Sequence, residues 1–127
     1  MLKVHFKNLG AATVLCLRGR LVSGETEILR NAVNSLPDVS PETGKVALDL
    51  ARVTTVDAAG LGVMLELRER FDKKGIRFEL MNVTSLVSRV LRITRLDSVF
   101  QITSGVEFFP GISRSGRVPV TQLASCA

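Results

Sequence analysis

Residues 56–65 read VDAAGLGVML, and an extended pattern gives way to a helical one within them. Before this stretch, the apolar residues of VALDL at 46–50 alternate as a strand requires. After it, apolar residues return at helical spacing until Gly75, a residue that commonly ends helices. The sequence therefore predicts that residues 56–65 join a strand to a helix.

The same two periods alternate along most of the chain. Residues 2–7 and 13–18 predict two paired strands, a hairpin across the loop that contains Gly10. The further expected strands are 46–50, 76–80 and 98–102, and the expected helices begin after Ser23, near Gly60 and at Thr84 or Ser85. This order predicts an α/β fold, with a mixed, mostly parallel sheet of about four or five strands and helices packed on it.

The 127 residues provide enough chain for one domain, which we place at residues 2–104. Residues 105–127 are rich in Gly, Ser, Pro and Arg and follow neither period, so we expect an irregular or flexible tail there. No apolar stretch approaches the ~20 residues of a membrane span. The N-terminus MLKVHFKNLG lacks the apolar core of a signal peptide. We therefore expect a cytoplasmic protein that does not insert into a membrane.

The net charge of +5 raises the question of nucleic-acid binding. Nucleic-acid modules usually combine basic clusters with aromatic side chains that stack on bases, and this chain has no Trp and no Tyr. Its densest basic feature is the set Arg89, Arg92 and Arg95, which are spaced to share one side of a helix. We interpret this set as a solvated face and expect no direct nucleic-acid partner.

The inventory of reactive side chains favours a binding protein over an enzyme. The only histidine, His5, lies in the first predicted strand, and no Ser-His couple, Cys-His couple or metal-ligand spacing can be assembled around it. Carboxylates are scattered along the chain without a pair that points to acid/base catalysis. We therefore expect no catalytic residue, no metal ion and no cofactor.

Asp57 stands where the predicted helix begins, so its carboxylate can cap the unpaired N–H groups of the first turn. The glycines that follow do not form a dinucleotide-binding loop, because Leu65 occupies the place of the third glycine. Gly60 and Gly62 instead allow another backbone to approach the start of the helix closely.

Residues 53–63, VTTVDAAGLGV, resemble the signature of the STAS domain, a family named for sulphate transporters and anti-sigma factor antagonists. In that signature a strand ends in Asp-Ser-Ser/Ala-Gly-Leu-Gly and a helix begins. Residues 17–21, LRGRL, resemble the family's strand that ends in Gly-x-Leu. The predicted order of elements over residues 2–103 is also the family's.

The resemblance implies a partner switch of the kind used by bacterial anti-sigma factor antagonists in transcription regulation. The unphosphorylated antagonist binds an anti-sigma factor that is also a serine kinase, and this frees the sigma factor. Phosphorylation of the serine after the aspartate breaks the complex, since a phosphate adds about two negative charges to a small, apolar contact.

This sequence departs from the family pattern where the phosphate would be added. Ala58 occupies the position of the phosphoacceptor serine, and Ala59 follows it. Three interpretations remain open: an antagonist that binds constitutively, a phosphorylation site moved to Thr54 or Thr55, or a module that never used phosphorylation. The last class includes STAS accessory subunits that bind the ATPase of ABC-type lipid transporters.

The predicted partner surface combines the helix start with the loop after the second strand. Its candidate residues are Asp57, Ala58, Ala59, Gly60 and Leu61, together with Arg20, Ser23 and Gly24. We expect Leu61 to project toward the partner, whereas Val63, Met64 and Leu67 belong to the core. The alternative is that Arg20, Ser23 and Gly24 are turn and cap residues only.

A second departure from the family pattern is Val22, which stands where antagonists usually carry an acidic residue. A homodimer is also left open.

Overall fold

A computed structural model of the chain describes residues 1–9, 12–36 and 44–103. The predicted tail at 105–127 lies outside these residues. The elements, in chain order, are β1 (Lys3–Leu9), β2 (Ala12–Leu21), α1 (Thr26–Asn34), β3 (Lys45–Val56), α2 (Ala58–Lys73), β4 (Arg77–Met81), α3 (Ser85–Ile93) and β5 (Gln101–Thr103).

The five strands form one sheet in the order β1-β2-β3-β4-β5. β1 and β2 pair antiparallel as a hairpin, and every later neighbour is parallel, because a helix crosses over between each pair of strands. The predicted α/β fold with a mixed, mostly parallel sheet is therefore confirmed.

Three element boundaries differ from the sequence-based expectation. β3 does not stop at residue 50 but continues to Val56, since its second half pairs with the end of β2. α1 begins only at Thr26, with Glu25 and not Ser23 at its N-cap position and without a side-chain cap, so the start expected directly after Ser23 is wrong. A turn closed by the Glu25 N–H on the Val22 carbonyl (3.0 Å) precedes the helix instead. β5 starts only at Gln101, because a turn closed on the Leu96 carbonyl comes first.

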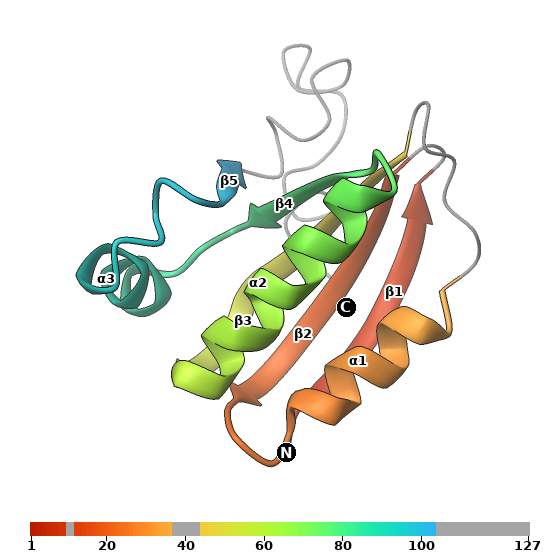
Figure 1. The fold of residues 1–127 in the computed structure, drawn as a ribbon. Coiled ribbons are helices and arrows are strands. Elements are labelled where there is room, and N and C mark those ends of the chain that lie inside the picture. Colours follow the sequence, from red (N-terminus) through yellow and green to blue (C-terminus); the bar gives the residue numbers. More distant parts are fainter. Residues whose placement is uncertain (10–11, 37–43, 104–127) are drawn as a thin grey trace, which may run out of the picture.

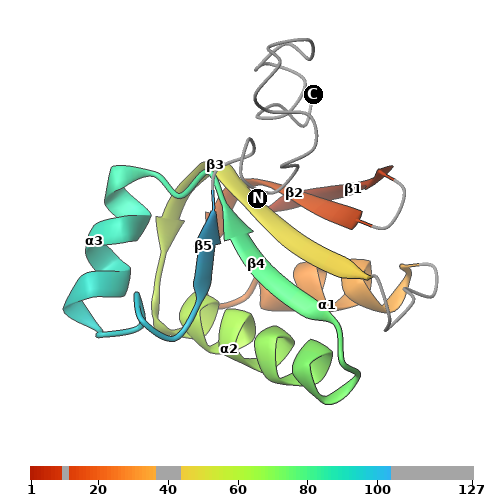
Figure 2. The same ribbon diagram turned by 90° about the horizontal axis from the view of Figure 1, so that it is seen from above.

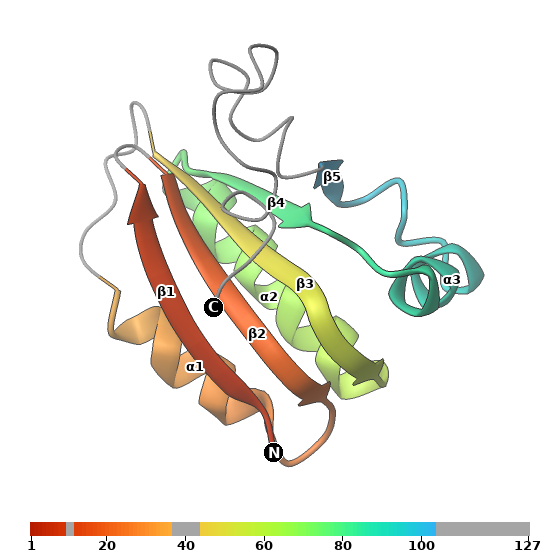
Figure 3. The ribbon, with the colours of Figure 1, turned by 180° about the vertical axis from the view of Figure 1, so that it is seen from behind.

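Helices α1 and α2 lie side by side on one face of the sheet, and α3 stands at its edge near the end of β3 (Figures 1 and 2). The main core fills the space between these two helices and the sheet. Its fully buried side chains include Leu15, Leu48, Leu80, Met64 and Leu67. The opposite face, seen in Figure 3, carries a second buried cluster of Ala12, Val14, Cys16, Ala47 and Met81.

α2 contacts the end of β2 through a glycine. The Cα of Gly60 lies so close to the Leu21 carbonyl oxygen that an added Cβ would collide with it. Gly62, one half-turn further along the helix, has open space where its Cβ would be. Only the first glycine is therefore required by packing.

These two glycines give a matched test of the contact. Gly60→Ala should lower the free energy of unfolding by about 2 kcal/mol or more, because α2 must shift away from β2. Gly62→Ala should stabilise the protein by up to about 1 kcal/mol, since alanine is the better helix former. Urea denaturation of both variants measures the difference, and equal stabilities would contradict the close contact.

Candidate functional site

The candidate site lies at the edge of the sheet where β2 and β3 end together. Leu21 and Val56, the last residues of these strands, are paired in register. The chain leaves Leu21 into the turn before α1 and leaves Val56 directly into α2. The loop after β2 and the start of α2, which are more than thirty residues apart in sequence, are thereby brought next to each other. In open α/β sheets, this carboxyl edge is where binding sites commonly form.

Asp57 connects these two segments with its side chain. One carboxylate oxygen, Oδ1, accepts a hydrogen bond from the Gly60 N–H at 2.9 Å and so caps α2, as predicted. The other, Oδ2, accepts one from the Ser23 N–H, also at 2.9 Å. We call this pair of hydrogen bonds the Asp57 clip. The main chain adds a third link, from the Asp57 N–H to the Leu21 carbonyl at 3.4 Å.

The clip also sets the electrostatics of the site. The hydrogen bonds from the Ser23 and Gly60 amides favour the charged carboxylate and lower the pKa of Asp57 below its ordinary value. Asp57 is therefore an anion at neutral pH, and it is held by backbone donors rather than by a lysine or arginine.

The predicted site residues divide into exposed and buried groups. Ala58, Ser23, Gly24 and Arg20 are exposed, Asp57 and Ala59 are half-buried, and Gly60 and Leu61 are buried. The structure thus brings the loop after β2 and the start of α2 to one surface. It does not place all of the predicted residues on that surface.

The expectation that Leu61 projects to a partner is wrong. Leu61 is only 7% exposed and belongs to the main core. The reason is helical phase: Leu61 precedes Met64 by three residues, and Met64 precedes Leu67 by three, so all three share the side that faces the sheet. Leu61 continues the core stripe back toward the first turn of α2 rather than lying off it.

Gly62, rather than Leu61, is exposed near the start of α2. It lies four residues after Ala58, so the two share the outward side of the first turns of α2, and both are exposed. The next residue on that side, Glu66, forms an ion pair with Arg30 of α1 at 2.9 Å. We define the docking edge as Arg20, Ser23, Gly24, Ala58 and Gly62. Counting four residues on from Ala58 would have found Gly62 in the sequence.

The two threonines of β3 lie close to this edge. Thr54 and Thr55 are both exposed although the strand continues through them. The Thr54 hydroxyl donates to the Gly19 carbonyl at 3.2 Å, and Thr55 pairs in register with Arg20. Phosphorylation at either threonine stays a prediction.

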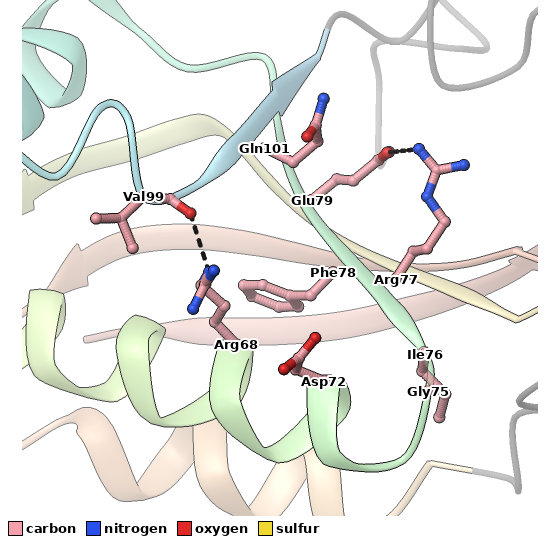
Figure 4. Close-up of a pocket in the computed structure, with 9 residues that line it drawn as sticks. All are labelled: Arg68, Asp72, Gly75, Ile76, Arg77, Phe78, Glu79, Val99 and Gln101. Atoms are coloured by element: carbon pink, nitrogen blue, oxygen red, sulfur yellow. Dashed lines mark hydrogen bonds and ion pairs between the residues drawn. The ribbon is translucent and has the colours of Figure 1, made fainter.

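A pocket of about 320 Å³ lies at the other end of α2, between that helix, β4 and the start of β5 (Figure 4). Arg68 donates from Nε to the Val99 carbonyl at 2.9 Å, and Arg77 pairs with Glu79 at 3.1 Å. Asp72 adds a second carboxylate, so the lining has two charges of each sign and selects no particular ligand. Across the described ranges, no group of three or more His, Cys, Asp or Glu side chains is placed to hold a metal ion.

Comparison with known proteins gives one family and several related folds. Residues 4–103 match the family model described as Mlab, STAS domain. A Thermotoga maritima protein, itself proposed to be an anti-sigma factor antagonist, has a TM-score of 0.72 at 24% identity, over 87% of this chain and 95% of that one. An anti-sigma factor antagonist from Mycobacterium paratuberculosis gives 0.69 at 18%, over 80% and 85%. A sulfate transporter family protein from Wolinella succinogenes gives 0.64 at 17%, over 76% and 80%. At these identities the structural similarities show a shared fold.

The charge of the Asp57 clip makes a pH-dependent contribution to stability. Because the pKa of Asp57 is lower in the folded protein, the contribution is present above the unfolded pKa of about 3.9 and is lost as pH falls through the folded value. Asp57→Asn should therefore be less stable than the wild type at about pH 7, with the difference shrinking near pH 3. Urea denaturation at both pH values measures this.

Asp97→Asn, which changes an exposed aspartate outside the site, is the control for general effects of charge. A stability loss in Asp57→Asn that stayed the same at both pH values would show that the charge does not strengthen the clip.

Proposed function

Because this chain belongs to the STAS domain family, we propose that it is a non-catalytic regulatory module that binds a protein partner through the docking edge. The partner we favour is an anti-sigma factor that is also a serine kinase. The protein would then act in the cytoplasm as an anti-sigma factor antagonist, and its effect on transcription would follow from sequestering that kinase.

The Asp57 clip is the observation that carries this proposal. It holds the Ser23–Gly24 loop and the first turn of α2 in one fixed arrangement through backbone hydrogen bonds. A surface that is ordered before binding loses less conformational entropy when the partner arrives.

The small residues of the docking edge support close protein contact. Ala58 and Gly62 are exposed on the first turns of α2, and the space beside Gly62 is open. With no long side chain at either position, a partner's backbone or apolar side chain can come near the helix surface. A phosphate at position 58 would prevent such contact, but Ala58 offers no hydroxyl to carry one. We therefore propose constitutive binding.

The second candidate function is that of a STAS accessory subunit on the ATPase of an ABC-type lipid transporter. The missing hydroxyls at Ala58 and Ala59 favour it, because such a subunit needs no phosphorylation switch. Val22 is a further observation in its favour, since this half-buried apolar residue replaces the acid usual in antagonists. The two candidates differ in the ATP-binding protein that should associate with the docking edge.

A charge placed on the docking edge should prevent partner binding. Ala58→Glu adds a carboxylate at the exposed first position of α2, where the helix N-terminus tolerates acids, so the fold should be kept. Tagged wild type should capture an ATP-binding protein from host lysate, and Ala58→Glu should lose it almost completely. Mass spectrometry identifies the captured protein as a kinase or an ABC ATPase.

The matched control is Ser98→Glu, which adds the same charge at an exposed residue outside the docking edge. Capture of the same ATP-binding protein by Ser98→Glu but not by Ala58→Glu supports the proposal. If both variants capture it as well as the wild type does, the docking edge is not the partner surface.

Restoring the hydroxyl should restore a switch if the captured protein is a kinase. Ala58→Ser, incubated with that kinase and ATP, should incorporate phosphate at residue 58 and then release the kinase. Wild type under the same conditions should incorporate none at that residue. Phosphate incorporation and binding are measured on the same samples. Binding of Ala58→Ser that persists after stoichiometric phosphorylation would contradict the proposed contact at this position.

A further inference from the structure

Helix α3 presents an outward face that the proposed docking edge does not use. Its inward residues Val87 and Leu91 are completely buried. On its outward side Leu86 is 45% exposed and Ile93 is 74% exposed. These two are seven residues apart, which is two helical turns, so they form one apolar line along the helix. Figure 2 shows α3 at the outside of the molecule, clear of α1 and α2.

Arginines accompany this apolar line. Arg89 and Arg92 are exposed on α3, and Arg95 is exposed just after it. The helix contains no acidic residue. None of the three arginines forms an ion pair with another residue of the described chain, although four other cationic groups do. We define the α3 stripe as Leu86, Arg89, Arg92, Ile93 and Arg95.

We infer that the α3 stripe docks on the surface of a membrane that contains anionic phospholipids. The guanidinium groups of Arg89 and Arg92 match lipid phosphates, which they can bind through two hydrogen bonds each. Leu86 and Ile93 lie on the adjoining side of the helix and can enter the boundary between headgroups and acyl chains. The net charge of +5 adds a general attraction to an anionic surface.

Aliphatic side chains beside the arginines distinguish this surface from a nucleic-acid site. Binding to single-stranded nucleic acid relies on aromatic side chains that stack on bases, and α3 has none. Leu86 and Ile93 would gain nothing from a phosphate backbone, whereas burial in lipid removes their apolar surface from water.

A bilayer suits the stripe better than an acidic protein does. A specific protein interface must match the shape of the surface that it covers as well as its charge. The stripe offers two exposed large apolar side chains, Leu86 and Ile93, on the outside of a single helix. A bilayer requires no shape match, and each basic residue near its surface adds to the attraction. The contact is peripheral, because no helix in the described part of the chain is long and apolar enough to cross a membrane.

Vesicle flotation with the full chain tests this inference. The probes are vesicles of phosphatidylcholine alone and vesicles with about one third phosphatidylglycerol. Wild type should float with the anionic vesicles at low salt, stay unbound with the neutral ones, and be released at about 0.5 M salt, where charges are strongly screened.

Three variants separate the α3 stripe from general charge. Arg89→Glu/Arg92→Glu should weaken binding to anionic vesicles by roughly tenfold or more, because two attractive charges become repulsive. Lys3→Glu/Lys74→Glu changes the net charge equally at exposed sites away from α3 and should retain most of the binding. Ile93→Ser keeps every charge and should also weaken binding, since an exposed apolar side chain is lost. Circular dichroism confirms that each variant is folded.

Wild type that fails to float with anionic vesicles would overturn the inference. So would equal losses in the two charge-reversal pairs, or Ile93→Ser that binds like the wild type, because net charge alone would then explain the binding. Arginine variants that bind vesicles normally but lose a protein partner would reassign the stripe to that protein. Ala58→Glu should float like the wild type, so this result is independent of the docking edge.

Discussion

The Leu21 carbonyl is the point on which the arrangement of the candidate site depends. It accepts the Asp57 N–H and at the same time lies against the Cα of Gly60. α2 can therefore start only where position 60 has no side chain, and it starts pressed against the end of β2. The Asp57 side chain then closes the arrangement by holding the Ser23 N–H. A steric limit and three hydrogen bonds together fix the position of the loop after β2 relative to the start of α2.

This constraint lets a chain with so few reactive side chains present an ordered surface at the docking edge. Asp57 makes its contacts with backbone amides, which every residue except proline provides, so the arrangement does not require particular side chains on the loop. The outward positions are consequently left to small residues such as Ala58 and Gly62. Under the proposed function, specificity at the docking edge would come chiefly from shape and close approach.

The fold could be predicted from the sequence because its elements follow clear local patterns. The alternation at 46–50, the cap at Asp57 and the helical spacing up to Phe71 are all local, and the structure keeps them. The second half of β3 is not predicted, because Val53 and Thr55 are held in the strand by pairing with the distant β2. Pairing of that kind leaves no periodic signal in the strand itself.

The candidate site was only partly predictable for the same reason. The role of Asp57 as a cap is local, but its bond to the Ser23 N–H joins segments that only the folded sheet brings together. The prediction that Leu61 is exposed is wrong for a local reason. Leu61 precedes Met64 by three residues, and this spacing already places it on the core side of α2. With Leu61 in the core, the residues at the start of α2 fall into two sets, one on each side of the helix. Gly60 and Leu61 are buried and build the fold, while Ala58 and Gly62 are exposed and belong to the proposed docking edge. The proposed partner surface and the folding constraint thus lie within five consecutive residues, 58–62, without sharing a side chain.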